Sequence, residues 1–253
     1  MQGLRVLLLG QGRLELDGQA LTRLLAPKQQ ALLFYLAAVG GSVARTRLAS
    51  MLWSELDEAS ARSNLRGAIS RLRRWLPEQL LIDAQQIGLA PGARCEVDLH
   101  ALTRARSSPD MAPAARCAAA DAWRGPLLDG FAVVSAEGFE EWLAQARPRA
   151  ERELQLLRHD LLRRSEAEGA LEDAASQARS LLDVDDADEA AHMALMRLLA
   201  ATGRRTAAIA QYEACRAALL QRLGARPSAE CYALHTHSFG RRCAEGCAGG
   251  ANA

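Results

Sequence analysis

The segment formed by residues 62–76 is the part of the sequence that most restricts how this chain can fold. At 3.6 residues per turn its apolar side chains fall on one stripe, which must face a core. The stripe consists of Leu65, Ile69, Leu72 and Leu76, with Ala61 and Ala68 at its edge. The opposite side carries Ser63, Arg66, Gly67, Ser70, Arg71 and Arg74, while Arg62 and Arg73 flank the stripe. The pattern predicts an amphipathic helix with a strongly basic exposed face.

The basic face carries five arginines that no acidic residue interrupts within the segment. Solvated helix faces usually place Glu four residues before Lys or Arg, and we expect no such pair here. Guanidinium groups without a neutralising partner favour a polyanion, because their planar fork binds phosphate or guanine edges in a bidentate manner. The face is therefore typical of a DNA-recognition helix. An ordinary basic surface helix is the alternative.

The length and composition of the chain set limits on its class. The 253 residues allow two ordinary domains, and a hydrophobic content of 49% supports packed cores. Residues 1–99 contain 12 Lys and Arg against 9 Asp and Glu, so the positive excess lies in this part. The first apolar run, residues 4–9, is too short for a signal-peptide core or a membrane span. We expect a cytoplasmic protein that does not contact a membrane, with most of its six irregularly spaced cysteines reduced.

Residues 1–97 show the element order of a winged-helix domain with an additional N-terminal sheet. Apolar strands and the turn signal Asp17-Gly18 predict a small antiparallel sheet at the start. Helices are expected at about residues 27–39 and 45–53, before the basic helix. Strand patterns at residues 80–82 and 87–89 then predict a hairpin. In this arrangement the third helix enters the major groove and the hairpin is the wing.

The Gly10-Gln11-Gly12 segment after the first strand is a possible dinucleotide-binding loop by its spacing alone. The third glycine of that fingerprint would fall at Glu15, whose carboxylate would repel a pyrophosphate. No helix pattern follows the glycines either. We therefore expect no nucleotide cofactor at this position.

Several motifs of the first part are similar to those of a known family. They are LLFYLA at residues 32–37, residues 45–53, ARSNLR at residues 61–66 and SRLRR at residues 70–74. Together they resemble the DNA-binding domain of the SARP/AfsR-type bacterial transcriptional activators. The resemblance implies an OmpR-like winged helix whose DNA contacts include Arg62, Asn64, Arg66, Arg71, Arg73 and Arg74. Adding the serines of the same face, Ser63 and Ser70, completes the candidate set, and helical periodicity favours Arg66, Arg71 and Arg74.

From residue 98 onward the sequence is helical and rich in alanine. A long helix is expected from about residue 139 to 165, followed by helices at about residues 170–182, 188–201 and 205–220. In the last pair Gly203, Ala207, Ala208 and Tyr212 lie at positions that resemble a tetratricopeptide repeat, where small residues let helices pack closely. The pattern predicts an all-α, TPR-like domain.

This second part resembles the bacterial transcriptional activator domain that follows the winged helix in the same family. The matching motifs are WRGPLL at residues 123–128, FEEWL at 139–143, DEAAH at 188–192 and GARPS at 224–228. The resemblance implies a helical module that mediates oligomerisation and contacts RNA polymerase. The expected division is a winged-helix domain at residues 1–97, the TPR-like domain at 98–240, and a disordered tail at 241–253.

No catalytic, cofactor or metal site is expected. No serine lies in a G-x-S-x-G turn, and the sequence contains no H-E-x-x-H motif or phosphate-binding loop. Zinc-type ligands occur near the C-terminus, but their spacing fits no standard zinc pattern; they are Cys231, His235, His237, Cys243 and Cys247. The isolated histidines and the tryptophans are interpreted as structural residues; these are His100, His159, His192, Trp53, Trp75, Trp123 and Trp142.

These observations predict a sequence-specific DNA-binding transcriptional regulator without enzyme activity. The expected partners are double-stranded DNA and, from the resemblance, RNA polymerase, and a homodimer on repeated half-sites is compatible with both. The alternative is a helical-repeat interaction protein whose winged helix binds another protein. A steep loss of affinity with salt would favour DNA, because phosphate contacts release counterions.

Overall fold

The computed structural model describes residues 3–90 and 95–239, and the chain divides into two compact units, Met1–Leu154 and Gln155–Ala253. The structure is mainly helical with a small β component at its start, as the sequence predicted. The tail expected at residues 241–253 lies outside the described residues.

The first unit opens with a four-stranded sheet of order β3-β2-β1-β7. Its strands are β1 (Leu4–Leu7), β2 (Arg13–Leu16), β3 (Gln19–Ala20) and β7 (Cys95–Val97). The first three strands are antiparallel, as predicted, whereas β7 pairs with β1 in parallel, with Val6 opposite Val97. The expectation of a purely antiparallel sheet was therefore incomplete. A strand of three residues from far along the chain carries no local turn signal that would reveal its partner.

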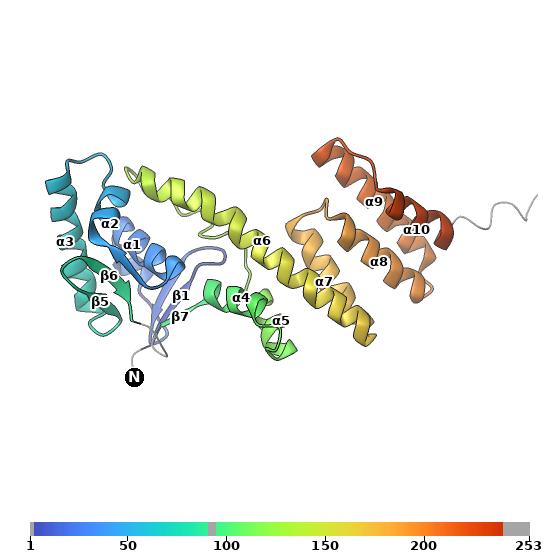
Figure 1. Ribbon diagram of the computed structural model, residues 1–253, viewed down its shortest axis with the longest axis horizontal. Helices are drawn as coiled ribbons and strands as arrows, with labels where there is room; N and C mark the ends of the chain where they lie inside the picture. Colours follow the sequence, from blue (N-terminus) through green and yellow to red (C-terminus); the bar gives the residue numbers. More distant parts are fainter. Residues whose placement is uncertain (1–2, 91–94, 240–253) are drawn as a thin grey trace, which may run out of the picture. The chain divides into compact units, whose positions relative to one another are not determined.

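Three helices and a second sheet form the winged helix of the first unit. The helices are α1 (Pro27–Val39), α2 (Arg45–Leu52) and α3 (Glu58–Trp75), and the strands are β4 (Ser42–Ala44), β5 (Leu80–Ile82) and β6 (Gln86–Leu89). Figure 1 shows the three helices gathered beside the hairpin β5–β6, which is the predicted wing. Residues 42–44, which lie between the first two predicted helices, form β4 and pair with β6, with Val43 opposite Ile87.

Gly10 belongs to a backbone contact rather than to a nucleotide-binding loop. Its φ is 103°, and a Cβ atom there would lie 3.0 Å from the Cβ atom of Arg124. The Gly10 amide donates to the Pro126 carbonyl at 3.1 Å, and the Leu128 amide donates to the Leu8 carbonyl at 2.9 Å. Glycine is required here because two backbones approach closely and the conformation is left-handed.

The first unit also contains α4 (Asp98–Ser107), α5 (Pro113–Asp121) and the first part of α6 (Glu137–Glu168). Asp98 fixes the start of α4 to the sheet, because its carboxylate accepts from the amides of Leu8 at 2.8 Å and Leu9 at 3.1 Å. Aromatic contacts with α1 fix both the start of α6 and Phe131, which precedes it. Phe34 meets Phe131 with ring centroids 5.1 Å apart, and Tyr35 of α1 meets Trp142 of α6 at 4.9 Å.

The division into compact units falls at residue 154, whereas the motifs predicted a domain boundary at residue 97. Residues 98–154 therefore pack in the same unit as the winged helix. The boundary at residue 97 remains a prediction about independent folding.

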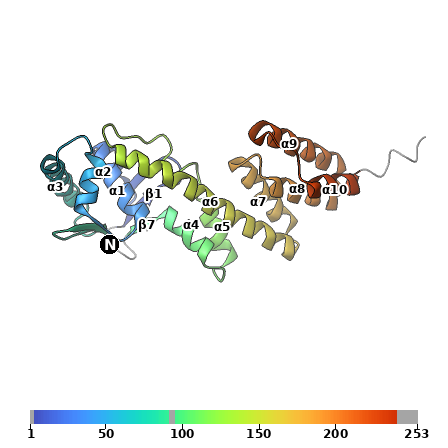
Figure 2. The same ribbon diagram turned by 45° about the horizontal axis from the view of Figure 1, so that its top comes forward.

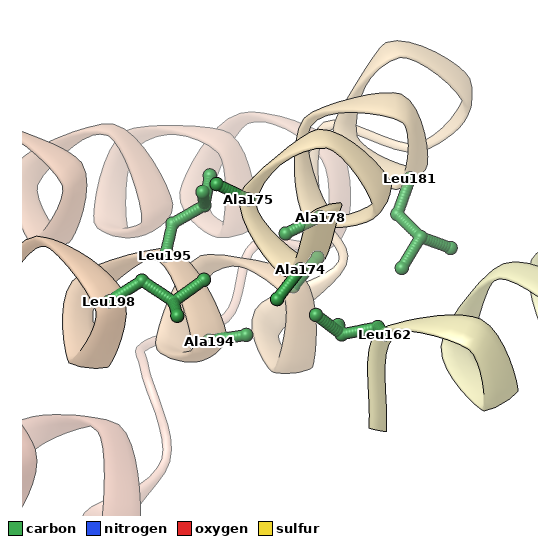
Figure 3. Close-up of a cluster of buried hydrophobic side chains, with 9 residues drawn as sticks. Leu162, Ala174, Ala175, Ala178, Leu181, Ala194, Leu195 and Leu198 are labelled. Carbon is green, nitrogen blue, oxygen red and sulfur yellow. The ribbon is translucent and has the colours of Figure 1, made fainter. Parts of the chain in front are cut away.

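The second unit is a stack of helices: the last part of α6, then α7 (Leu171–Val184), α8 (Glu189–Ala201), α9 (Arg205–Leu223) and α10 (Ala229–Phe239). In two views α8, α9 and α10 lie side by side (Figures 1 and 2). A first cluster of buried side chains joins Leu162 of α6 to α7 and α8, with Ala174, Ala178 and Leu181 gathered around it (Figure 3). Small residues at these positions, Ala174 and Ala178, allow close packing of the helices.

A second cluster joins α8, α9 and α10. Ala208 is fully buried and Tyr212 is 8% exposed, in agreement with their expected repeat positions. Gly203 is instead exposed, and a Cβ atom there would meet no neighbouring atom within 4 Å, so the expectation of close packing at Gly203 was wrong. Helix α10, which the sequence analysis did not delimit, closes this end of the cluster with the buried Cys231.

Candidate nucleic-acid interface

Helix α3 begins at Glu58 because Asp57 caps it. The Asp57 carboxylate accepts from the amides of Ala59 and Ser60, both at 3.0 Å. Hydrogen bonds from the Ser60 hydroxyl and from the Ser60 amide hold the pKa of Asp57 below its ordinary value. A cap of this kind satisfies amide groups that have no partner inside the helix. The cap therefore determines where the basic helix starts.

We expect Asp57→Ala to lower the Tm of the first unit by about 2–4 °C at pH 7. The folded-state pKa of Asp57 is lowered, so the stabilisation is present above the ordinary aspartate pKa, about 3.9, and is lost as the pH falls through the folded value. The difference in Tm between wild type and Asp57→Ala should therefore shrink below about pH 4. Asp57→Asn is the control, because asparagine also caps helices and should preserve the Tm at pH 7. Equal Tm values for wild type and Asp57→Ala would contradict the capping role.

The apolar stripe of α3 faces the core, as predicted. All of its side chains are at most 7% exposed; they are Ala61, Leu65, Ala68, Ile69, Leu72 and Leu76. They pack where α3 meets α1 and α2. All eight candidate DNA contacts are exposed on the other sides of α3. The fold thus brings the candidate residues together on one exposed helix surface.

The structure corrects one expectation about the charges of this surface. Arg62 forms an ion pair with Glu58, one turn earlier in the same helix. The expectation that no Glu would pair with these arginines was therefore wrong, because the helix starts at Glu58 and not at Arg62. Both partners are well exposed, so the pair contributes little to stability and can exchange with a phosphate. Among the residues that the structure describes, no carboxylate forms an ion pair with Arg66, Arg71, Arg73 or Arg74.

A groove of about 520 Å³ borders one side of the α3 surface. Ser63, Asn64 and Arg71 line it, together with the start of α1, Trp53 and residues 132–134. Arg66, Ser70 and Arg74 follow one another at intervals of four residues and do not line the groove. Three candidate residues, Ser63, Asn64 and Arg71, therefore border the groove, whereas the row of Arg66, Ser70 and Arg74 lies outside it.

The start of α2 and the turn of the wing supply further basic and polar groups near α3. Arg45 donates through Nη1 to the Asp83 carbonyl at 3.1 Å, and its amide donates to the Gln85 carbonyl at 2.8 Å. These bonds fix the wing to α2. Arg47 of the same helix is exposed.

Trp75 differs from the expectation that all four tryptophans are packing residues. Trp53 is 8% exposed and carries the Lys28 ammonium 5.4 Å from its ring centre, whereas Trp75 is 44% exposed at the end of α3. The fully buried side chain at this end is the adjacent Leu76. The ring of Trp75 therefore adds an apolar surface beside the basic face.

The three isolated histidines have hydrogen-bond partners that fit structural roles. His100 lies 3.4 Å from the Ala38 carbonyl, and His159 lies 2.7 Å from the Asp188 carboxylate. The buried His192 lies between the Asp186 carbonyl and the Gln211 amide. Of the zinc-type ligands near the C-terminus, Cys243, Cys247 and the side chain of His237 lie outside the described residues.

Comparison with known proteins agrees with this architecture. The family described as "Bacterial transcriptional activator domain" matches residues 93–237, more than half of the chain. Among solved structures, "Mycobacterium tuberculosis EmbR in complex with low affinity phosphopeptide" is similar, with a TM-score of 0.68 and 21% sequence identity. That match covers 94% of this chain and 65% of the EmbR chain. No curated protein sequence matched. The similarity to EmbR, at this identity, concerns the fold, and it includes the winged helix that precedes the family match.

Among residues 3–90 and 95–239, no helix has the length and apolar character needed to cross a membrane.

Proposed function

The chain belongs to the bacterial transcriptional activator domain family and is a SARP-type transcriptional regulator, and from this premise we propose that α3 binds specific sequences of double-stranded DNA. The observation that carries the proposal is the row formed by Arg66, Ser70 and Arg74 on the exposed side of α3. A capped helix held by a buried stripe presents this row at fixed spacing, which direct reading of base edges requires. The hairpin β5–β6 is the proposed wing against the DNA backbone.

Base and phosphate contacts are assigned by position on the helix. Arg66 and Arg74 lie in the row away from the groove and are the proposed readers of base edges. Arg62, Arg71 and Arg73, with Ser63, Asn64 and Ser70, are proposed to position the helix against phosphates or neighbouring bases. Selection of bound sequences from a random duplex library tests the proposal. Recovery of no common sequence would contradict specific reading.

Glu58→Gln is expected to strengthen DNA binding by up to about fivefold at low salt, because the ion pair with Arg62 no longer competes with phosphate. The gain should decrease as salt rises, since exposed charges are then screened. Fluorescence anisotropy with a labelled target duplex measures the change. Asp17→Asn, which removes an exposed carboxylate on the β2–β3 turn, is the control and should leave the affinity unchanged. A loss of affinity in Glu58→Gln would contradict a phosphate contact by Arg62.

We further propose that the helical part of the chain contacts RNA polymerase and that the protein activates transcription. The support is the family of residues 93–237 and the stacked helices of the second unit, which offer an extended binding surface. The test is transcription in vitro from a promoter that carries the selected site, with purified bacterial polymerase. Activation should disappear in an Arg66→Ala/Arg74→Ala variant. Polymerase binding without DNA should be retained by the same variant, because the proposed surfaces are separate.

Protein binding by the winged helix is the second candidate function. The groove beside α3 and the exposed apolar side chains of Trp75 and Val134 favour it.

A pair of subunits on repeated half-sites is also proposed, since a second contact raises the effective affinity. Salt dependence separates DNA binding from protein binding, and light scattering with and without duplex DNA measures the number of subunits.

A further inference from the structure

Helices α8, α9 and α10 bring together three side chains with metal-binding atoms. They are Glu189 of α8, Cys215 of α9 and Cys231 of α10, and the carboxylate oxygen and the two Sγ atoms all lie within 4.8 Å of one another. Both cysteine side chains are fully buried and Glu189 is half-buried. The three residues come from different helices that lie side by side in both ribbon views (Figures 1 and 2).

The carboxylate of Glu189 is held in place toward this cluster. Its Oε1 atom accepts from the amide of Ser228 at 2.6 Å, just before α10 begins. The Ser228 hydroxyl in turn accepts from the Cys231 amide at 3.2 Å. Metal ligands that accept additional hydrogen bonds are oriented for coordination by them. The start of α10 is thus fixed both to the carboxylate and to one of the thiols.

The spacing of the three ligand atoms fits a small tetrahedral metal site. Zn²⁺ binds thiolate sulfur at about 2.3 Å and carboxylate oxygen at about 2.0–2.2 Å, which places ligand atoms roughly 3.5–4 Å apart. Atoms already within 4.8 Å reach this spacing through small side-chain movements. We propose that Glu189, Cys215 and Cys231 bind one thiophilic divalent cation, of which Zn²⁺ is the best fit, with water as the fourth ligand.

The protonation of the thiols determines how such a cation would bind. Burial raises the pKa of Cys215 to about 12 and also raises the pKa of Cys231. Without metal both thiols are therefore protonated near pH 7 and pack as small apolar groups. A bound Zn²⁺ replaces the two S–H protons by two Zn–S bonds, with no change in oxidation state, and about two protons are released to solvent.

A cation at this position would cross-link three helices at one end of the second unit. The site differs from the zinc-type cluster considered from the sequence, because only Cys231 belongs to both. Cys215 and Glu189 lie 16 and 42 residues before Cys231, so no short motif reveals them. The inference does not depend on the proposed DNA binding.

The test uses the full chain in reducing buffer after chelator treatment, in a Cys243→Ala/Cys247→Ala background that removes the tail thiols. Titration with Co²⁺ should give one equivalent of binding, with near-ultraviolet thiolate-to-cobalt absorption and the visible bands of a tetrahedral site. Zn²⁺ should displace Co²⁺. At a 100-fold excess of free Zn²⁺ over its Kd, the Tm should rise by about 5–10 °C. Absence of the absorption in this background would overturn the proposal.

Three variants and one control complete the design. Cys215→Ala and Cys231→Ala should abolish the thiolate absorption, and Glu189→Gln should weaken binding by about tenfold or more. Cys117→Ala, on α5, should bind as the parent does. Far-ultraviolet circular dichroism without metal verifies folding. If the cysteine variants do not fold, Glu189→Gln decides, since its amide oxygen can still accept from Ser228; unchanged affinity in this variant would overturn the assignment.

Discussion

Arg66→Ala and Arg74→Ala are each expected to reduce the affinity for the selected duplex by about 1–3 kcal/mol, and to relax sequence preference at the base that each arginine contacts. The two side chains lie two turns apart on the exposed side of α3, and no carboxylate among the described residues pairs with either. The double variant should lose roughly the sum, because side chains at this distance read separate positions. Fluorescence anisotropy at fixed ionic strength measures the effect.

The form of the salt dependence separates base reading from phosphate binding. Arg71→Ala or Arg73→Ala should weaken binding to all sequences alike and reduce the salt slope by about one if either contacts a phosphate. Arg23→Ala is the matched control, because Arg23 is exposed in the same unit but distant in sequence from α3. If Arg66→Ala and Arg74→Ala both bind the duplex as tightly as Arg23→Ala does, α3 is not the helix that reads the bases.

The sequence was sufficient to predict α3 and its two faces. An apolar stripe at helical spacing must be buried, and every residue assigned to that stripe is buried. The wing hairpin was also predictable, because two apolar strands flank a polar turn. These features depend on periodicity within one segment, which a single sequence contains in full.

The start of α3 and the pair between Glu58 and Arg62 were missed for a local reason. The pattern was read from the first arginine, whereas the helix begins one turn earlier at the residue after the Asp57 cap. The sequence contains a cap signal at Asp57, and this signal indicates the start of the helix better than the position of the first arginine does. Helix starts are better placed by caps than by the composition of the exposed face.

The short strands β4 and β7 and the cluster of Glu189, Cys215 and Cys231 were not predictable from local patterns. Each depends on a partner that lies far away in the chain, such as β1 for β7. Strands of three residues carry too few positions to show alternation. Groups brought together by helix packing likewise have no fixed spacing in the sequence.

Phe139→Ala is expected to lower the unfolding free energy of the first unit by about 3–5 kcal/mol, which is the largest destabilisation that we predict. The reason is that α6 packs against the winged helix at this residue. Phe139 is fully buried, and its ring centre lies 5.9 Å from that of Phe131 and 5.3 Å from that of Trp142. Phe131 and Trp142 in turn contact Phe34 and Tyr35 of α1. A cavity at this position therefore removes contacts on which α1 depends.

The same substitution tests whether residues 1–97 fold independently. If they do, Phe139→Ala should leave the stability and the DNA affinity of the winged helix unchanged. We expect instead that its thermal transition moves to lower temperature together with the loss of DNA binding, because Phe131 and Trp142, which pack against Phe34 and Tyr35, lose their contact with Phe139. Val134→Ala, which shortens an apolar side chain that is 88% exposed nearby in sequence, should change the stability by at most about 0.5 kcal/mol. A residue assigned by motif to the activator domain would then be a structural requirement of the winged helix.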